Sequence, residues 1–127
     1  MNHSTINNWV KGYVDAWRSP GTMKLANLFT NDLSYRVSPW KKPLSGLEEL
    51  AAFWENSRSG PDEKFELQNE IVAVEGRTAV VMITVTYEQD EPDRWRDLWV
   101  LRFDEQDLCC TFEEWPFSPD QDDGHHI

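Results

Sequence analysis

The feature that most constrains the fold is a series of four β-segments that fills the second half of the chain. These segments are rich in β-branched and aromatic residues and cover residues 63–76, 77–89, 93–104 and 107–117. Short polar turns separate them at Glu75-Gly76, Gln89 to Pro92 and Glu105-Gln106. Long strands joined by short turns predict an antiparallel meander.

The first half of the chain has helical rather than alternating periodicity. Residues 5–18 place six apolar side chains on one helical stripe: Ile6, Trp9, Val10, Tyr13, Val14 and Trp17. Ser4 or Thr5 is the expected cap of this helix, and residues 19–21 are expected to end it. A short second helix is predicted at 23–29 and a strand at 33–37. Ser45 followed by Glu48 is typical of a capping box and begins a third helix, which ends at 59–61. Its buried face is expected to hold Leu47, Leu50, Ala51 and Trp54.

Helices that precede a meander of strands indicate an α+β fold, with three N-terminal helices packed on a curved antiparallel sheet. The 127 residues suffice for one hydrophobic core. We therefore expect a single domain over residues 1–119 and a polar, flexible tail over 120–127.

The composition excludes several classes of function. A net charge of −11, from 23 acidic and 12 basic residues, disfavours nucleic acid as a partner. No apolar run is long enough to span a membrane, and the first residues lack a signal-peptide pattern, so a cytoplasmic location is expected. The adjacent Cys109 and Cys110 are expected to be reduced thiols. No metal-ligand spacing or glycine-rich phosphate loop is present, so neither a metal nor a cofactor is predicted.

The order of these segments resembles the NTF2-like, or SnoaL-like, superfamily of α+β cone folds. The resemblance covers about residues 5–117 and depends on the order and spacing of five motifs: YVDAW, LANLFTNDLSYR, PLSGLEELAAFW, LWVLRF and FEEW. It implies a sheet that curls around the helices and encloses an apolar pocket, and a homodimer formed through the outer face of the sheet. This superfamily contains both enzymes and non-enzymes, so the fold does not define the function.

Ketosteroid isomerases of this superfamily need a tyrosine, a basic carboxylate and a neutral carboxylic acid. Tyr13 matches the tyrosine of the first helix. Ser38 stands at the position of the base and Trp99 at that of the acid, and neither can perform the required proton transfer. The resemblance therefore does not predict this isomerase chemistry.

Epoxide hydrolases that resemble limonene-epoxide hydrolase match the sequence at two positions. Tyr35 matches their water-binding tyrosine and Glu114 their carboxylate, whereas Val37 replaces their asparagine. Their Arg-x-Asp motif has no clear counterpart in VVMITVTYE. Histidine-dependent dehydratase or cyclase chemistry is disfavoured, because the histidines, His3, His125 and His126, lie near the termini.

Glu114 is the strongest catalytic candidate. In the register that the resemblance implies, Cys110, Phe112 and Glu114 face the interior, and burial would raise the pKa of the glutamate toward the range of a general base. Three alternatives remain: Glu114 lies in solvent, it forms a structural ion pair with Arg36, or a one-residue slip brings Glu113 inward instead.

The other site residues are predicted as partners of Glu114 or as the pocket wall. Tyr13 and Tyr35 are the polar partners, although Tyr13 and Trp54 could equally bond each other as core aromatics. The segment around Trp40 is either the lip of the pocket or a packed corner. Thr84 is expected to point inward beside Met82, and the full predicted wall comprises Trp17, Arg36, Ser38, Trp40, Trp54, Met82, Thr84, Trp99 and Phe112.

Two functions remain open at this point. The first is a homodimer that binds a small, largely apolar organic ligand, with Glu114 as general base or hydrogen-bond acceptor in a cofactor-independent hydrolysis, hydration, isomerisation or cyclisation. The second is a non-catalytic module whose interior is filled by tryptophan side chains. In that case an apolar outer sheet face, predicted at Val81, Ile83, Val85 and Tyr87, would bind a partner.

Overall fold

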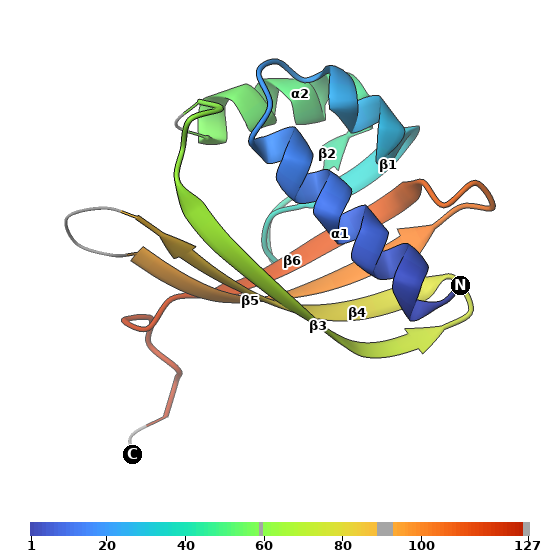
Figure 1. Ribbon diagram of the computed structural model, residues 1–127. Coiled ribbons are helices and arrows are strands. Elements are labelled where there is room, and N and C mark those ends of the chain that lie inside the picture. The colour runs from blue at the N-terminus through green and yellow to red at the C-terminus, as the bar shows by residue number, and fades with distance from the viewer. Residues whose placement is uncertain (59, 89–92, 126–127) are drawn as a thin grey trace.

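One curved six-stranded sheet carries both α-helices on the same face (Figure 1). The computed structural model describes residues 1–58, 60–88 and 93–125. In chain order, the elements are α1 (His3–Trp17), the 3₁₀ helix η1 (Met23–Asn27), β1 (Phe29–Arg36), β2 (Leu44–Ser45), α2 (Gly46–Ser57), β3 (Phe65–Glu75), β4 (Thr78–Tyr87), β5 (Asp93–Phe103) and β6 (Cys109–Phe117). The α+β class is therefore confirmed, and the predicted turn at Gln89 to Pro92 lies outside the described residues.

The sheet has the strand order β2-β1-β6-β5-β4-β3. Strands β3 to β6 pair with their sequence neighbours in antiparallel fashion, as the meander predicts. The sheet is nevertheless mixed, because β1 and β6 are parallel, and the prediction of a wholly antiparallel sheet is wrong. These two strands are far apart in the sequence, so no hairpin turn constrains their relative direction.

The structure contains two α-helices among the described residues, not the three predicted. The segment expected as a second helix forms the five-residue 3₁₀ helix η1, and Phe29 already begins β1. Its hydrogen bonds join residues three apart, from the Leu25 amide to the Thr22 carbonyl and from the Leu28 amide to the Leu25 carbonyl. Both leucine side chains are buried. So short a segment between a turn and a strand has no room for an α-helix.

The predicted helix caps differ in detail. Asn2, rather than Ser4 or Thr5, caps α1 by accepting a hydrogen bond from the Thr5 amide at 2.9 Å. Ser45 is the N-cap residue of α2, but its side chain makes no capping bond, so the predicted capping box does not form. Ser45 instead belongs to β2 and pairs with Ser34 of β1, which fixes its extended conformation.

The inner face of the sheet, defined here as the face under the helices, carries the core. In β4, Ala79, Val81, Ile83 and Val85 are buried, whereas Met82 is 41% exposed. The predicted orientation of β4 is therefore wrong by one residue. Both alternating sets of AVVMITVTY contain apolar side chains, so the pattern alone does not identify the face that turns inward.

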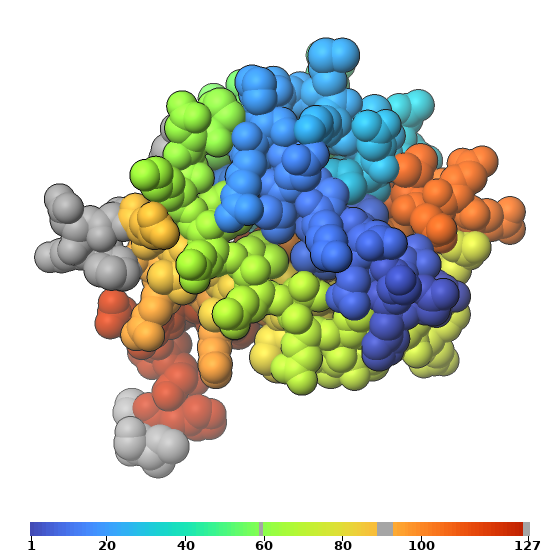
Figure 2. Space-filling model, viewed as in Figure 1, coloured from blue at the N-terminus to red at the C-terminus, as the bar shows by residue number. Residues whose placement is uncertain are grey.

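Helix α1 lies across the inner face beside β3, and the two close over the interior in the space-filling view (Figure 2). Its buried stripe comprises Ile6, Trp9, Val10, Tyr13 and Ala16. Trp9 donates its indole N–H to the Leu28 carbonyl at 2.9 Å, which joins the helix to the segment that enters β1. The predicted face is confirmed at the four residues that both sets share, whereas Val14 and Trp17 are only half-buried.

Arg58 is a buried residue that joins the ends of the two helices. Its guanidinium donates to four backbone carbonyls at the end of α1 and just after it, those of Ala16, Trp17, Ser19 and Gly21. It also donates to the carboxylate of Glu55. These carbonyls lie at or just after the helix end, where they lack intrahelical partners. Arg58 thus holds the C-terminal end of α1 against that of α2.

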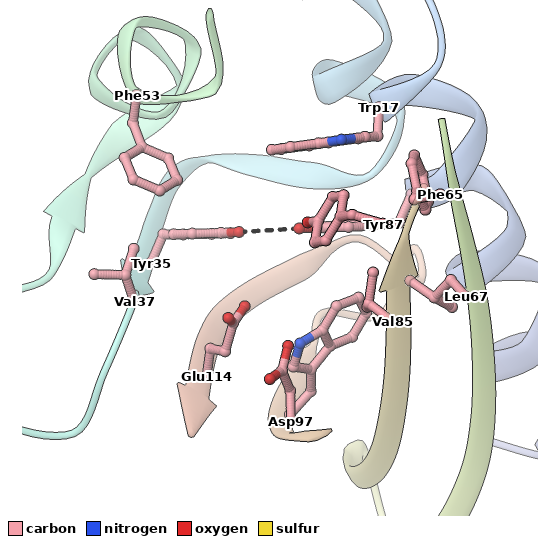
Figure 3. A pocket seen from close by; sticks show the side chains of 12 residues that line it. Trp17, Tyr35, Val37, Phe53, Phe65, Leu67, Val85, Tyr87, Asp97 and Glu114 are labelled. Atoms are coloured by element: carbon pink, nitrogen blue, oxygen red, sulfur yellow. Dashed lines mark hydrogen bonds between the residues drawn. The ribbon is translucent and has the colours of Figure 1, made fainter. Parts of the chain in front are cut away.

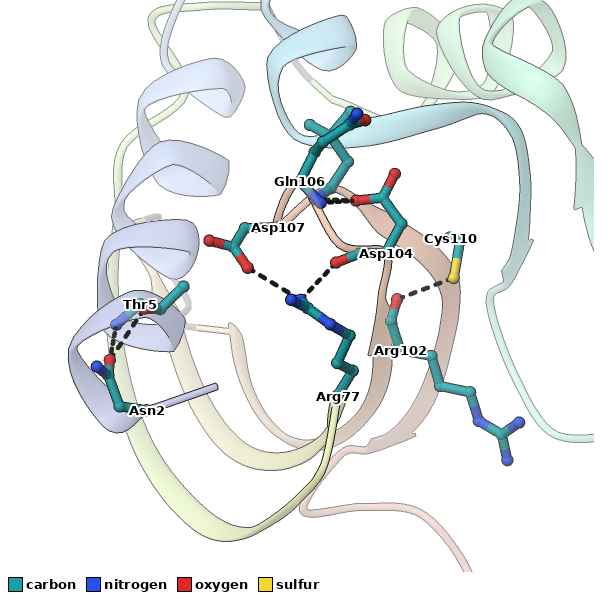
Figure 4. A network of polar contacts seen from close by, with 9 residues as sticks. Asn2, Thr5, Arg77, Arg102, Asp104, Gln106, Asp107 and Cys110 are labelled. Atoms are coloured by element: carbon teal, nitrogen blue, oxygen red, sulfur yellow. Dashed lines mark hydrogen bonds and ion pairs between the residues drawn. The ribbon is translucent and has the colours of Figure 1, made fainter.

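The two hairpin turns at the opposite end of the sheet are also connected by polar contacts (Figure 4). The side chain of Asp104 accepts from the amides of Gln106 and Leu108, which fixes the β5–β6 turn. Arg77, next to the β3–β4 turn, donates to the carbonyl of Asp104 and pairs with the carboxylate of Asp107 at 3.2 Å. The strands are therefore held together at this end.

Candidate active site

A cavity of about 130 Å³ lies between the helices and the inner face of the sheet (Figure 3). We call it the inner cavity. Its lining consists of seven aromatic side chains, three aliphatic ones and two carboxylic acids: Tyr13, Trp17, Tyr35, Val37, Phe53, Phe65, Leu67, Val85, Tyr87, Asp97, Trp99 and Glu114. The volume approaches that of an engineered apolar cavity of roughly 150 Å³ that binds benzene. It can therefore hold a small organic group.

Glu114 of β6 lines the inner cavity, as predicted. Phe112 is buried on the same face, whereas Glu113 points away and pairs with Arg36 of β1 at 3.2 Å. The predicted register of β6 is confirmed at these positions. The alternative pairing of Glu114 with Arg36 is wrong, and so is the alternative slip that would bring Glu113 inward.

The prediction that Cys110 also faces inward is wrong. Cys109 is fully buried, and a register irregularity interrupts the pairing of β5 and β6 between Arg102 and Phe103. An extra residue at such a bulge reverses the alternation of side chains on one side of it. Burial raises the pKa of the Cys109 thiol well above its ordinary value.

Asp97 of β5 is a second carboxylic acid in the inner cavity. It is only 8% exposed, and its Oδ1 atom is buried without a hydrogen-bond partner among the described residues. In the sheet register Asp97 faces Pro116, and Trp99 faces Glu114. The two acids are therefore diagonal neighbours on adjacent strands, a relation that typically separates Cα atoms by roughly 7–8 Å. Figure 3 shows both carboxyl groups pointing into the same space.

Burial perturbs both acids, but to different extents. Desolvation raises the pKa of Asp97 from 3.8 to about 6, and the backbone N–H of Phe117 offsets part of that rise. Desolvation, reinforced by the negative charge of Asp97, raises the pKa of Glu114 from 4.5 to about 8. The indole N–H of Trp99 favours the Glu114 carboxylate, although it lies outside ordinary hydrogen-bond geometry. At neutral pH the pair therefore holds one proton, and the higher pKa favours Glu114 as its carrier.

Tyr13 of α1 and Tyr35 of β1 meet at the wall of the cavity. Their hydroxyl oxygens lie 3.3 Å apart, and both side chains are buried. Burial raises the pKa of each phenol well above its ordinary value, so both hydroxyls keep their protons. One of the two protons is used in the bond between them, and the other remains available to a ligand. The predicted closeness of these tyrosines to Glu114 is confirmed, and their catalytic role stays a prediction.

The predicted wall residues divide into three groups. Trp17 and Trp99 line the inner cavity. Trp54 and Phe112 lie behind its wall, where Trp54 packs against Tyr13 at 5.1 Å and Phe112 stacks on Tyr35 at 4.2 Å between ring centroids. The Trp54 indole N–H has no hydrogen-bond partner among the described residues, so the predicted bond between its tip and Tyr13 does not form.

The remaining wall predictions are wrong in position. Met82 and Thr84 belong to the outward-facing set of β4, and Arg36 is held on the other face of β1 by Glu113. Trp40 is 98% exposed, which excludes the packed corner, and it is not among the residues that line the inner cavity. Ser38 does not line the cavity either; its carbonyl accepts from the Lys41 amide in the turn that follows β1.

Asp97 escaped the sequence analysis although the sequence contains a signal for it. In DRWRDLWVLRF, the alternate positions Trp95, Asp97, Trp99, Leu101 and Phe103 form one face of the strand. Asp93 begins the same set at the exposed end of the strand, so Asp97 is the acid that has apolar neighbours on both sides, Trp95 and Trp99. A lone carboxylate on an apolar strand face indicates a buried acid.

Other kinds of site find no support in the described part of the chain. No group of three or more His, Cys, Asp or Glu side chains there is arranged to hold a metal ion. No helix among the described residues is long and apolar enough to cross a membrane.

The model of the SnoaL-like domain family matches residues 10–110. Among solved structures, a protein from Jannaschia sp. CCS1 named as a SnoaL-like polyketide cyclase is similar over 89% of this chain and 85% of its own, with a TM-score of 0.72 and 17% identity. A protein from Parabacteroides distasonis ATCC 8503 named as a ketosteroid isomerase covers 88% and 87%, with a TM-score of 0.61 and 18% identity. An epoxide hydrolase from M. tuberculosis covers 90% and 84%, with a TM-score of 0.64 and 10% identity. No curated protein sequence matches significantly.

Proposed function

The chain belongs to the SnoaL-like domain family, and from this premise we propose that it is an enzyme that transfers protons on a small, largely apolar organic molecule without a cofactor. The observation that carries the proposal is the pair of acids, Asp97 and Glu114, in a cavity otherwise lined by aromatic and aliphatic side chains. Structural neighbours named as a cyclase, an isomerase and a hydrolase support a small-molecule reaction in general terms.

The different pKa values of the two acids suggest their roles. Asp97, with a pKa of about 6, is ionised at neutral pH and can accept a proton. Glu114, with a pKa of about 8, is neutral and can donate one. A pair whose environments separate the two pKa values is suited to acid–base catalysis. The proposal therefore makes Glu114 the general acid, in place of the general base expected from sequence, and Asp97 the base.

The two tyrosines complete the proposed site. The hydroxyl proton that the Tyr13–Tyr35 pair does not use can stabilise negative charge that develops on a substrate oxygen. In this scheme Asp97 takes a proton from carbon or from water, and Glu114 returns one to the oxygen that becomes negative. No redox step or cofactor is required. Isomerisation, hydration and ring opening all fit this balance.

The proposal can be tested with 1,2-benzisoxazole, a small bicyclic probe. A base removes its carbon-bound proton, the N–O bond breaks, and the electron pair goes to the oxygen, which gives an absorbing cyanophenolate. We expect Asp97→Asn to lower kcat/KM by about 10²-fold, the usual contribution of a general base. Glu113→Gln, a matched change on the outward face of β6, should leave the rate unchanged. An Asp97→Asn variant as fast as the wild type would refute the assignment.

The pH profile provides a second test of the same roles. The rate should rise as Asp97 ionises, with a pKa of about 6, and fall as Glu114 loses its proton, with a pKa of about 8. Glu114→Gln should remove the alkaline limb and keep the acidic one. A profile that is flat from pH 5 to pH 9 would contradict the paired roles.

A non-catalytic binding module remains the second candidate, and the size of the cavity favours it. The inner cavity, at about 130 Å³, is smaller than the ~300 Å³ at which ligand pockets usually begin. If this candidate is correct, the probe binds without turnover and none of the carboxyl variants changes its background rate.

We also propose that the protein forms a homodimer through the outer face of the sheet. Met82, Leu98 and Trp115 are cross-strand neighbours on that face, and Met82 and Trp115 are 41% and 39% exposed. Light scattering should give twice the chain mass for the wild type and the mass of one chain for Met82→Glu. Thr86→Glu, nearer the end of the same strand, is the control. A monomeric wild type at micromolar concentration would exclude the dimer.

A further inference from the structure

The inner cavity combines two acids with no base among the described residues. No lysine, arginine or histidine side chain lines it. None of the four ion pairs of the described residues includes Asp97 or Glu114. Buried carboxylates are normally paired with a cation or bound to a metal. This pair has neither within the described chain.

Asp97 brings a carboxyl group to the cavity wall, and none of the ion pairs of the described residues neutralises it. The residue is 92% buried, and its Oδ1 atom has no hydrogen-bond partner among the described residues. In Figure 3 its carboxyl group faces the same space as that of Glu114. A buried acceptor without a partner loses its solvation unless a ligand or a water molecule supplies a donor or a positive charge. The site is therefore better suited to a cation than to an anion.

The aromatic walls favour the same kind of ligand. Trp17, Tyr87 and Trp99 line the cavity, together with four further aromatic rings. The faces of such rings carry negative electrostatic potential, which attracts organic cations once water is removed. Arg18 already lies over the ring of Phe65, 4.5 Å from its centre, but it donates to the Phe65 carbonyl and does not line the cavity. Among the described residues, no other basic side chain covers the aromatic rings that line the cavity.

The groove next to the cavity is also acidic. It shares Tyr87 with the inner cavity, and its lining, as far as the structure describes it, includes Glu63, Glu88 and Asp93 against one base, Lys64. Negative charge beside an opening raises the local concentration of cations and speeds their entry. A net charge of −11 acts in the same direction.

We propose that the inner cavity selects a small organic cation, with its ammonium group held against the Asp97 carboxylate and its apolar surface against the aromatic walls. A quaternary or substituted ammonium ion matches a cavity of about 130 Å³. The inference rests on the cavity being the small-molecule site of the proposed function, and not on turnover. It narrows the apolar ligand expected from the sequence to one that also carries a positive charge.

The test compares three ligands of nearly equal shape by calorimetric titration of the full chain. Choline is permanently positive, 3,3-dimethylbutan-1-ol is its neutral analogue, and 3,3-dimethylbutanoate is negative. We expect choline to bind about tenfold or more tightly than the alcohol, because a desolvated cation gains both aromatic and carboxylate contacts. The anion should bind least. Added salt should weaken choline binding and leave alcohol binding unchanged.

Variants locate the effect within the cavity. In Asp97→Asn, choline and the alcohol should bind with nearly equal affinity. The variant should still bind the alcohol, which would show that its cavity is intact. Glu113→Gln, which removes an outward-facing charge from β6, should keep the preference. If Asp97→Asn fails to fold, the comparison of the three ligands on the wild type still decides.

Each outcome discriminates between the proposals. Equal binding of choline and the alcohol would overturn the cation inference and leave the proposed small-molecule function standing. A preference for choline that survives in Asp97→Asn would also overturn it, because the charge recognised would lie elsewhere. If none of the three ligands binds, this inference fails, and turnover of the bicyclic probe then decides the proposed function separately.

Discussion

Replacing Glu114 with glutamine should make the folded protein more stable, by an amount that grows with pH. The wild-type carboxyl has a pKa raised from 4.5 to about 8 in the folded state. Above pH 4.5 the unfolded chain releases this proton while the folded chain keeps it, so wild-type stability falls as the pH rises toward 8. Glutamine has nearly the same shape and does not titrate. The destabilising contribution is therefore absent from the variant.

The size of the effect follows from the interval between the two pKa values. Each pH unit within it lowers the free energy of unfolding by about 1.4 kcal/mol, so the change from pH 5 to pH 8 is at most about 4 kcal/mol. Glu114 keeps part of its surface exposed, and the solvent that reaches it screens the charge. We therefore expect about half of the maximum, roughly 2 kcal/mol, as the pH-dependent gain of the variant.

Urea unfolding at pH 5, 6.5 and 8, followed by tryptophan fluorescence, measures this difference directly. The control is Glu113→Gln, because Glu113 lies on the same strand but pairs with Arg36 on the outer face. That variant should show no gain at pH 8. Parallel stability curves for wild type and Glu114→Gln, within about 0.5 kcal/mol at all three values of pH, would refute the argument that the carboxyl is desolvated.

Three further substitutions test the surrounding structure by the same unfolding measurement. Arg58→Lys should lower the free energy of unfolding by about 2–4 kcal/mol, because an ammonium group cannot satisfy the four carbonyls that the buried guanidinium reaches; a loss below about 0.5 kcal/mol would contradict this role. Gly46→Ala should lower the free energy of unfolding by about 1 kcal/mol more than Gly76→Ala does. Both glycines have positive φ, but only at Gly46 does the added Cβ approach a backbone oxygen, that of Asn31 at 3.3 Å. Equal losses would show that this contact is unimportant. Tyr35→Phe should lower stability by about 1 kcal/mol through loss of its buried hydroxyl bond, and an unchanged midpoint would argue against that bond.

The elements that could be predicted are those whose apolar face is unambiguous. In α1 the apolar stripe repeats at helical spacing, and four of its six residues are buried in the structure while Val14 and Trp17 are half-buried. In β6 the resemblance placed Phe112 and Glu114 on the inner face, and both lie there. In β4 the set that begins at Ala79 is wholly apolar and the set that begins at Val80 combines Val80 and Met82 with two threonines, and the prediction placed the second, mixed set inward, which is wrong. Patterning identifies a strand more readily than its orientation.

The part of the site that could not be predicted depends on contacts between distant segments. Glu114 was identified because the superfamily resemblance supplied its register, whereas Asp97 was not, because that resemblance directed attention to Trp99 on the same strand. That the two acids are diagonal neighbours depends on the pairing of β5 with β6, which includes an irregularity near Phe103. A local pattern contains no information about such an offset. Trp40 is an error in the other direction, because the sequence predicts a packed or cavity-lining aromatic there and the side chain is fully exposed.

The energetics of the acid pair argue that the pair exists for a purpose other than folding. Each acid is desolvated at neutral pH, and neither has a basic partner among the described residues. A fold whose only requirement was stability would gain from leucine or glutamine at either position, because apolar groups of similar volume fill such sites without an electrostatic penalty. The closely packed aromatic rings of the core, such as those around Tyr13 and Tyr35, supply stability that offsets the cost of the two acids. Local destabilisation supported by a rigid scaffold is the arrangement expected of a functional site. If the stabilised Glu114→Gln variant also keeps the alkaline limb of the wild-type pH profile, this reasoning fails, because the cost would then serve nothing that the cavity does.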